Sequence, residues 1–312
     1  MPQRIIILCI ALVLDLLFGD PPNAYHPTAW MGSLIVFFTN HAPKTNKPGI
    51  QFFYGTIIVL LGAVIVGVIG WGLVLLIQNL PYPINLLLAG LLVKSTFTVR
   101  GLVNISNEIT NALQTNDLED ARRLTSWHLV SRDTTSLNTS QVSAAAIESV
   151  AENTSDSIVA PIFYYLVFGL PGALIYRFIN TSDALLGYRD ERREWLGKVS
   201  ARADDFLNLV PARLTVLLLF FAAPFSGCDL KKAVSIWRTD RYKTDSPNAG
   251  HPMSAAAGGL GIKLEKVDRY VLGEDGRDPQ PGDLEKMVRL MQWSVGIGIL
   301  LVVVCGIGFG GI

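Results

Sequence analysis

The sequence predicts an all-α, polytopic integral membrane protein whose helical loops face the cytoplasm. The composition supports this, because 50% of the 312 residues are hydrophobic and only 17% are charged. Long uncharged segments also alternate with polar ones, as in a chain that crosses a membrane several times. Apart from Asp15 and Asp20, every acidic residue lies between Glu108 and Glu285, so polar chemistry is expected in the middle of the chain.

The membrane helices follow from length and composition, since one span takes about 20 apolar residues. The first apolar segment is short and carries Asp15. A signal peptide is its rival interpretation, but no small-residue cleavage site follows. The glycines of the second segment predict close packing against another helix. We expect membrane helices at about 4–18, 52–78, 84–103 and 293–312.

Two further segments, 157–179 and 206–225, are predicted either to span the membrane or to enter and leave by one face. A Gly-Leu-Pro-Gly motif at 169–172 interrupts the first. If that segment crossed once, the arginine-rich stretch after it would lie outside, against the positive-inside rule, so a re-entrant path is favoured. The polar regions are then 104–156, 180–205 and 226–290, and the whole chain is expected to form a single membrane-embedded domain.

The polar regions are predicted to be helical. Asn116 followed by Glu119 resembles a capping box, and the alanine-rich segment 140–153 should form a helix. No run shows the two-residue period of a strand. The formal net charge is zero, which leaves no basic field for nucleic acid, so nucleic acid is not an expected partner. The cysteines show no metal-binding spacing.

Glu148, Glu152 and Asp156 are four residues apart, so on a helix they form one acidic stripe. The stripe runs directly into apolar sequence, where ionisable groups usually have a partner or a function. A divalent cation would remove the repulsion between them, and Mg²⁺ favours one or two carboxylates together with phosphate oxygens. These carboxylates are therefore candidate metal ligands or acid–base groups; the alternative is a solvated helix face.

Arginines occur in two later motifs, Gly-Tyr-Arg with Tyr188 and Arg189, and the segment from Asp204 through Asn208 to Arg213. The planar guanidinium matches phosphate or carboxylate. The alternative is an interfacial helix that contacts lipid headgroups.

The turn that contains Ser246, Asn248 and Gly250 leads into a run of small residues. Small residues let backbone N–H groups approach an anion. A tight turn against a closely packed helix explains the same sequence, and both interpretations stay open here.

Taken in order, these motifs resemble the CobD/CbiB family of adenosylcobinamide-phosphate synthases, and the similarity covers most of the chain. Its further parts are Asp20 with His26, Arg132-Asp133-Thr134, Ala-Glu-Asn at 151–153 and Asn180 to Asp183. The resemblance implies an enzyme that uses ATP and Mg²⁺ to join adenosylcobyric acid to (R)-1-aminopropan-2-ol or its O-phosphate through an amide. The product would be adenosylcobinamide or its phosphate, in cobalamin biosynthesis.

The resemblance also implies a multi-pass protein in the lipid bilayer of a prokaryotic cell membrane, with its site facing the cytoplasm. Other late enzymes of the pathway are possible partners. The expected catalytic residues are Glu148, Glu152, Asp156, Asp204 and Asp205, the first three also as metal ligands. The expected substrate- and phosphate-binding residues are Asp20, His26, Arg132, Asp133, Asn153, Asn180, Asp183, Tyr188, Arg189, Asn208, Arg213, Ser246, Asn248 and Gly250.

The sequence departs from the family pattern at three places. Ser131 stands where glycine is usual, His-Pro-Met at 251–253 replaces Trp-Pro-Glu, and Leu-Glu-Lys at 264–266 replaces Leu-Gly-Gly. No catalytic role is therefore expected after Gly250. Two other functions remain as alternatives: a transporter of a polar or corrinoid-like substrate, and a non-catalytic membrane signalling relative. No inverted repeat supports the first, and the intact acidic stripe speaks against the second.

Overall fold

The computed structural model describes residues 2–43, 45, 47–187, 194–266 and 269–309. These residues are almost entirely helical, which confirms the all-α prediction. Four helices are long and apolar enough to cross a membrane, so the chain is a polytopic membrane protein. They are α3 (Pro48–Ile77), the helical stretch Thr139–Leu186, α10 (Leu209–Ser226) and most of α13 (Pro281–Phe309).

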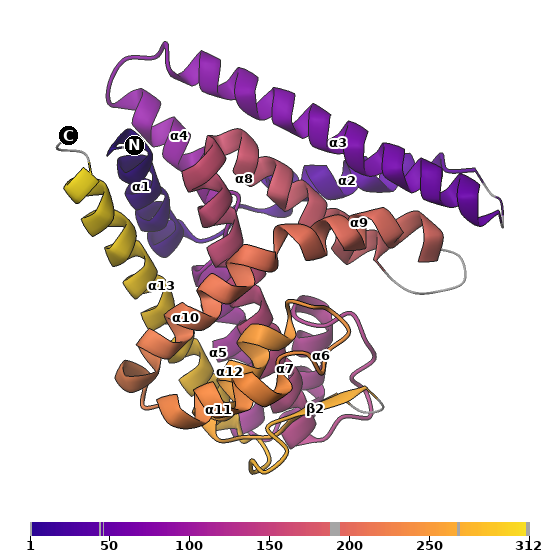
Figure 1. Cartoon of the computed structure of the whole chain (residues 1–312), viewed down its shortest axis with the longest axis vertical. Coiled ribbons are helices and arrows are strands. Elements are labelled where there is room, and N and C mark those ends of the chain that lie inside the picture. The colour runs from indigo at the N-terminus through magenta and orange to yellow at the C-terminus, as the bar shows by residue number, and fades with distance from the viewer. Residues whose placement is uncertain (1, 44, 46, 188–193, 267–268, 310–312) are drawn as a thin grey trace. The chain divides into compact units, whose positions relative to one another are not determined.

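The chain forms two compact units, each with its own buried core (Figure 1). The first unit comprises residues 1–98, 160–208 and 306–312, and the second comprises residues 99–159 and 209–305. The helices of the first unit are α1 (Pro2–Phe18), η1 (Asn23–Tyr25), α2 (Pro27–Asn40), α3, α4 (Ile84–Lys94), α8 (Ala160–Leu186) and α9 (Glu194–Leu207).

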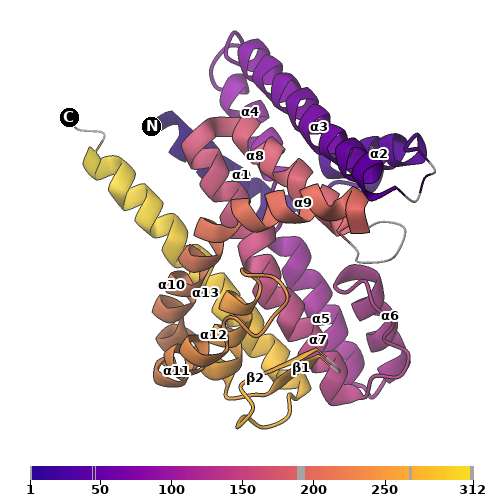
Figure 2. The same cartoon turned by 45° about the vertical axis from the view of Figure 1, so that its right-hand side comes forward.

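Helix α3 packs closely along α8 and α9 in the first unit (Figure 2). The glycines of α3 make this approach, as the sequence predicted. A Cβ atom at Gly62 would lie 2.0 Å from the ring of Phe178, and one at Gly55 would lie 2.1 Å from the carbonyl oxygen of Leu196. Larger residues at these two positions would push the helices apart.

The predicted interruption at the Gly-Leu-Pro-Gly motif is a reversal of the chain within α8. Gly169 has φ 73° and ψ −166°, a backbone conformation that is essentially restricted to glycine. The ring of Tyr164 stacks on that of Tyr176, with centroids 5.1 Å apart. In a straight helix these residues would be separated by about 18 Å along the axis. The two limbs of α8 therefore lie side by side.

The segment predicted as one helix over 84–103 is divided, which corrects that prediction. α4 ends at Lys94, and α5 (Arg100–Gln114) begins five residues after Ser95. The hydroxyls of Ser95 and Thr96 each donate a 2.7 Å hydrogen bond to a backbone carbonyl of the preceding turn. Such local bonds compete with a continuous helix.

The second unit contains α5, α6 (Leu118–His128), α7 (Thr139–Asn153), α10, α11 (Leu230–Asp240), α12 (Gly250–Leu260) and α13. The helix predicted at 140–153 is confirmed by α7. The capping box predicted at Asn116 is wrong, because Asn116 adopts φ 61° and Asp117 is the residue that caps α6. A capping box does occur at the start of α7, between Asn138 and Gln141.

Three other features of the second unit differ from expectation. A π-helix, η2 (Thr154–Val159), follows α7 directly. Strands β1 (Leu264–Lys266) and β2 (Tyr270–Leu272) form a hairpin, too short for its two-residue period to be recognised in the sequence. α13 begins at Pro281 rather than near residue 293, because proline is favoured in the first turn of a helix even within polar sequence.

Candidate active site

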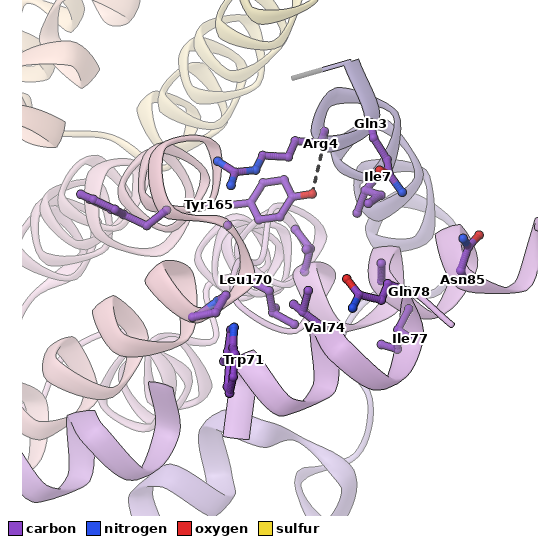
Figure 3. Close-up of a pocket in the computed structure, with 15 residues that line it drawn as sticks. Gln3, Arg4, Ile7, Trp71, Val74, Ile77, Gln78, Asn85, Tyr165 and Leu170 are labelled. Atoms are coloured by element: carbon purple, nitrogen blue, oxygen red, sulfur yellow. Dashed lines mark hydrogen bonds between the residues drawn. The ribbon is translucent and has the colours of Figure 1, made fainter. Parts of the chain in front are cut away.

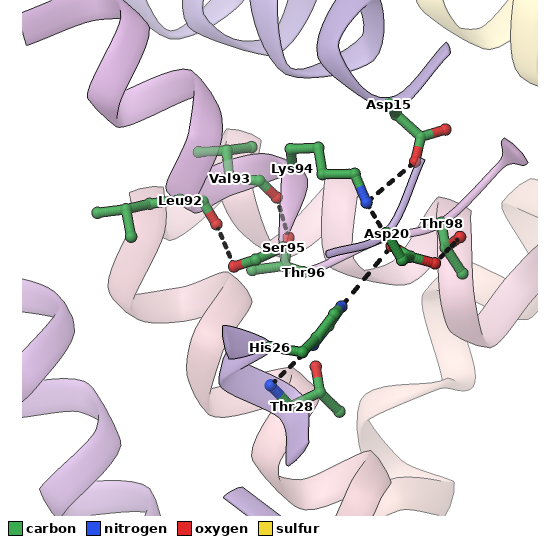
Figure 4. Close-up of polar contacts among 10 residues, drawn as sticks. All are labelled: Asp15, Asp20, His26, Thr28, Leu92, Val93, Lys94, Ser95, Thr96 and Thr98. Atoms are coloured by element: carbon green, nitrogen blue, oxygen red, sulfur yellow. Dashed lines mark hydrogen bonds and ion pairs between the residues drawn. The ribbon is translucent and has the colours of Figure 1, made fainter. Parts of the chain in front are cut away.

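A buried ionic cluster forms where α1, α2 and α4 end or begin in the first unit (Figure 4). The ammonium group of Lys94, only 3% exposed, lies 3.3 Å from the carboxylate of Asp15 and also pairs with Asp20. Thr98 donates a 2.6 Å hydrogen bond to Asp20, and Nε2 of His26 lies 3.7 Å from the same carboxylate. Asp20 and His26, two predicted site residues, are thus in one cluster.

The electrostatics of the cluster favour an ionised Asp20. Burial of its carboxyl group opposes ionisation, but the interactions with His26, Lys94 and Thr98 outweigh burial and hold the pKa of Asp20 well below its usual range. His26 accepts a 3.1 Å hydrogen bond from the backbone N–H of Thr28 and so caps α2. The Asp20 carboxylate is therefore a fixed negative charge.

A pocket of ≈ 330 Å³ opens beside this cluster. Asp20, His26 and Thr98 line it, together with Arg177 from α8. Nη1 of Arg177 also donates to the side-chain oxygen of Asn180 at 3.3 Å. Arg177 therefore connects the pocket to the polar residues that α8 and the end of α9 bring together.

Among these residues, Asp204 is buried, with 8% of its surface exposed, and is held between two amides. Asn180 donates to one of its carboxylate oxygens at 3.1 Å, and Asn208 donates to the other at 3.0 Å. The hydroxyl of Tyr176 donates to Asn208 at 2.9 Å. Burial raises the pKa of Asp204 to about 6, although the two amides favour the charged form and Asp205 opposes it.

In the second unit, Glu148 lies on the fully buried part of α7 and is 6% exposed. One carboxylate oxygen is 3.6 Å from a guanidinium nitrogen of Arg132. The other, Oε1, is buried and makes no hydrogen bond of regular geometry among the described residues, although the hydroxyl of Tyr270 interacts with this carboxylate. Tyr270 of β2 lies next to this carboxylate; burial, together with the charges of Glu148 and Glu152, raises the pKa of Tyr270. A buried oxygen without a regular hydrogen bond costs about 1–3 kcal/mol, so it points to a ligand.

The acidic stripe is altered by the π-helix. Glu152 and Asp156 are both half-buried. Because η2 begins at Thr154, the α-helical spacing does not fix the direction of Asp156 relative to Glu148. Among the described residues, no three His, Cys, Asp or Glu side chains are grouped to hold a metal ion. One or two carboxylates are sufficient for Mg²⁺ bound through phosphates, and Oε1 of Glu148 fits that arrangement.

Two predicted residues near the stripe are engaged locally. The amide of Asn153 donates to the backbone carbonyl of Ser149 at 2.9 Å and accepts from Ser157 at 2.7 Å, so it braces the junction between α7 and η2. Asp133 is exposed in the loop before α7. Hydrogen bonds from the backbone and hydroxyl of Thr135 lower the pKa of Asp133.

Arg213 of α10 reaches the turn before α12. It donates to the side-chain oxygen of Asn248 at 2.9 Å and to the backbone of Leu209 at 2.8 Å. The hydroxyl of Ser246 accepts from the backbone N–H of Asn248 at 3.2 Å. A Cβ atom at Gly250 would lie 2.5 Å from a backbone oxygen of Arg241. The glycine and the fully buried α12 therefore support the closely packed helix foreseen as one interpretation of this motif.

The predicted residues thus fall into separate groups. The first unit holds Asp20 and His26 at the pocket, Asn180, Asp204 and Asn208 in the amide network, and half-buried Asp183 and Asp205. The second holds Arg132, Asp133, Glu148, Glu152, Asn153, Asp156, Arg213, Ser246, Asn248 and Gly250. Tyr188 and Arg189 lie outside the described residues. Sequence reasoning missed Lys94, Arg177 and Tyr270 as site residues. The first two were visible as lone charges in apolar segments, whereas nothing singled out Tyr270.

A second pocket in the first unit, of ≈ 350 Å³, is mainly apolar (Figure 3). It lies between α1, the end of α3, the start of α4 and the reversal of α8. Arg4 at its edge donates to the backbone carbonyls of Leu166 and Val167, which the reversal leaves available. None of the predicted site residues lines this pocket, so it is not a candidate active site.

Residues 8–291 match the family described as CobD/Cbib protein. The chain is 42% identical over 280 residues to the cobalamin biosynthesis protein CobD of Dehalococcoides mccartyi, covering 89% of this chain and 90% of the relative. It is 39% identical over 270 residues to the probable cobalamin biosynthesis protein CobD of Methanocaldococcus jannaschii, covering 86% and 88%. It is 35% identical over 315 residues to the cobalamin biosynthesis protein CbiB of Salmonella typhimurium, covering 97% and 98%. No solved structure matches the chain.

Proposed function

Because the chain belongs to the CobD/CbiB family of cobalamin-biosynthesis proteins, we propose that it is an ATP-dependent acid–amine ligase. It joins the propionate carboxylate of adenosylcobyric acid to the amine of (R)-1-aminopropan-2-ol or its O-phosphate. The product is adenosylcobinamide or its phosphate. We place the reaction at the cytoplasmic face of a prokaryotic cell membrane.

A carboxylate must be activated before an amine can displace one of its oxygens. A propionate oxygen attacks the γ-phosphorus of ATP and ADP leaves, which gives an acyl phosphate. The amine nitrogen then attacks the acyl carbon, and inorganic phosphate leaves with the propionate oxygen. A base accepts the proton that the nitrogen loses. The protein must therefore bind phosphate, hold a carboxylate and take up one proton.

Glu148 carries this proposal, because it is a buried carboxylate with one oxygen near Arg132 and the other without a hydrogen bond of regular geometry. We assign Glu148 and Glu152 to hold Mg²⁺, which when bound would neutralise charge on the ATP phosphates. A metal-ligand role for Asp156 stays a prediction. Arg132 is assigned to bind a phosphate or the propionate, since its guanidinium presents paired donors.

The proton acceptor is assigned to Asp204. Its pKa of about 6 lies close to cytoplasmic pH, which is the condition for an efficient general base. The adjoining network through Asn180 and Arg177 leads to the pocket beside Asp20 and His26. That pocket is assigned to the amino alcohol, whose volume is far smaller than that of a corrinoid.

The test uses the full-length protein in phospholipid nanodiscs with adenosylcobyric acid, ATP, Mg²⁺ and either acceptor. Products are separated by liquid chromatography and identified by mass, and ADP is measured in parallel. Glu148→Gln keeps the side-chain volume but removes the charge, and should lower ligation at least about 100-fold, as loss of a group that stabilises transition-state charge does. Glu119→Gln, on the exposed side of α6, is the matched control and should leave the rate unchanged.

Two results would contradict the proposal. Amide formation by the wild-type protein without consumption of ATP would remove the activation step. Full activity of Glu148→Gln, with an unchanged dependence on Mg²⁺, would remove Glu148 from the site. Uptake of the corrinoid into sealed vesicles without ligation would instead favour the transporter.

A further inference from the structure

Two arginines of the second unit converge on the start of α12. Arg213 comes from α10, and Arg241 follows the end of α11. Arg241 stacks on the rings of Trp237 and Tyr242, with its guanidinium carbon 4.7 Å and 4.8 Å from their centroids. We call Arg213, Arg241, Tyr242 and His251 the arginine cluster. Nη1 of Arg241 also donates to the backbone carbonyl of Arg238 at 2.8 Å, so stacking and this hydrogen bond together hold the guanidinium in place.

The arginine cluster has no acidic partner within the described part of the chain. Neither Arg213 nor Arg241 forms an ion pair with a described carboxylate. Asp240, which precedes Arg241, is instead bound to Lys243 at 2.9 Å and to the backbone of Gly273 at 2.8 Å. Hydrogen bonds from Arg241 and Arg213, together with the charges of both arginines, lower the pKa of Tyr242. The cluster therefore carries two positive charges that the surrounding protein does not neutralise.

His251 adds a buried donor to this cluster. Its ring is 2% exposed and packs against Tyr242, with centroids 5.5 Å apart. Nδ1 accepts a 3.1 Å hydrogen bond from the indole N–H of Trp237, so in the neutral ring Nε2 carries the proton. Nε2 is buried and has no partner among the described residues. Burial and the charges of Arg213 and Arg241 lower the pKa of His251 to about 4, so the ring is neutral at physiological pH.

We infer that the arginine cluster binds the phosphate chain of a nucleotide, with Arg241 and the Nε2–H of His251 as donors in addition to Arg213. Two guanidinium groups without a carboxylate partner and a buried, unpartnered N–H lie beside the hydroxyl of Tyr242, and such a group of donors suits an anion with many oxygens. The assignment rests on the proposed function, in which a nucleotide is the phosphate source. Through His251 it extends that site beyond Gly250, where no functional residue was expected from the sequence.

The number of charges favours a di- or triphosphate over a monoester. A single phosphate ester carries at most about two negative charges, and one arginine can bind it in a bidentate manner. Two separate arginines with additional donors match a longer chain of phosphates. A lipid headgroup presents one phosphodiester charge and competes for the same donors, so the test must separate these ligands.

The experiment measures equilibrium binding of radiolabelled ATP to the full-length protein in phosphatidylcholine nanodiscs, with no corrinoid present. Arg241→Met keeps the stem of the side chain and should weaken ATP binding about 10- to 100-fold, the effect of losing a charge-assisted hydrogen bond. His251→Phe keeps an aromatic ring of similar shape and should weaken binding by about tenfold or less. Arg238→Met, one turn earlier on α11 and exposed, is the control and should bind as wild type.

Competition identifies the ligand. Inorganic triphosphate and ADP should displace ATP from the wild-type protein, and this displacement should weaken in Arg241→Met. Aminopropanol phosphate should not compete. Arg241→Lys, which keeps the charge but not the planar fork, should recover part of the affinity. The thermal stability of Arg241→Met is compared with that of Arg241→Lys and the wild type in the same nanodiscs. Equal stability would show that the loss of ATP binding in Arg241→Met does not come from misfolding.

Unchanged ATP affinity in Arg241→Met would overturn the inference. So would competition by phosphatidylglycerol in the nanodisc, which would make the cluster a headgroup site, or equal competition by aminopropanol phosphate. The outcome is separable from that of the proposed function. If ATP binding depends on Arg241 but the wild-type protein forms no amide product, the proposed ligase function alone is refuted. If the protein ligates but Arg241→Met binds ATP as tightly as the wild type, the nucleotide role of the arginine cluster alone is refuted.

Discussion

Replacement of Lys94 by methionine is expected to destabilise the first unit strongly. The ammonium group lies 3.3 Å from the carboxylate of Asp15, which is 0% exposed. At an effective dielectric constant of ~20, two charges at this distance attract by about 5 kcal/mol. Desolvation of both groups offsets much of this attraction in the intact pair. Removal of one partner leaves a buried charge, which typically costs about 3–5 kcal/mol, so we expect Lys94→Met to lose an amount in that range.

A double-mutant cycle separates the ion pair from the loss of side-chain volume. Asp15→Asn alone leaves Lys94 paired with Asp20, so it should cost less than Lys94→Met. In the double variant neither member of the Asp15–Lys94 pair carries a charge. Its destabilisation should be smaller than the sum of the two single changes by at least about 1 kcal/mol, because contacting groups in one network couple.

Unfolding is followed by circular dichroism in detergent micelles as a function of denaturant, for the wild type and the three variants. Lys47→Met, an exposed lysine at the start of α3, is the matched control and should change stability by less than about 0.5 kcal/mol. Additive effects in the cycle, or a Lys94→Met variant as stable as the control, would refute the reasoning that this cluster is a buried charge network.

Three further outcomes follow from the structure. Burial raises the pKa of Asp204 in the folded state from 3.8 to about 6. The stability that protonated Asp204 contributes is therefore greatest below about pH 4 and is lost as the pH rises through 6. Over that range the melting temperature of the wild type should fall relative to that of Asp204→Asn. Gly197→Ala should cost about 1–3 kcal/mol in denaturant unfolding, since the new Cβ would lie 1.8 Å from the backbone oxygen of Leu186, whereas Gly72→Ala, with open space, should not destabilise. In a cysteine-free background, Arg202→Cys and Thr135→Cys should be labelled from the same side of the membrane and Asn79→Cys from the other; labelling of residue 202 with residue 79 would mean that 157–179 crosses once.

Features that depend on local sequence were predictable. The glycines of α3 indicated close helix packing, and Gly62 and Gly55 make it. The Gly-Leu-Pro-Gly motif indicated an interruption, and Gly169 reverses the chain. The alanine-rich segment became α7. In each case the residue type itself restricts the backbone or the contact distance, so no knowledge of distant partners was needed.

Features set by distant partners were not predictable. α4 was expected to continue to residue 103, but Lys94 is drawn to carboxylates of α1 and the following loop. The environment of Glu148 depends on Tyr270, which a three-residue strand brings to α7. The prediction of an acidic stripe assumed an unbroken α-helix. The π-helix that begins at Thr154 changes the angular position of Asp156 on the helix relative to Glu148. Spacing in the sequence therefore identified the carboxylates but not their mutual geometry.

The reversal at Gly169 bears directly on the path through the membrane. The helical stretch of 48 residues would be about 72 Å long if straight, more than twice the ~30 Å thickness of the hydrocarbon core. The limb that enters the reversal runs over residues 139–168 and is about 45 Å long, and the limb that leaves it runs over residues 170–186 and is about 26 Å long. A single crossing would place the basic residues after α8 outside, against the positive-inside rule, so the re-entrant path of 157–179 stays a prediction. Where backbone bends within an apolar segment, its free polar groups must also find hydrogen-bond partners. Arg4 supplies two of them, because it donates to the carbonyls of Leu166 and Val167 beside the reversal.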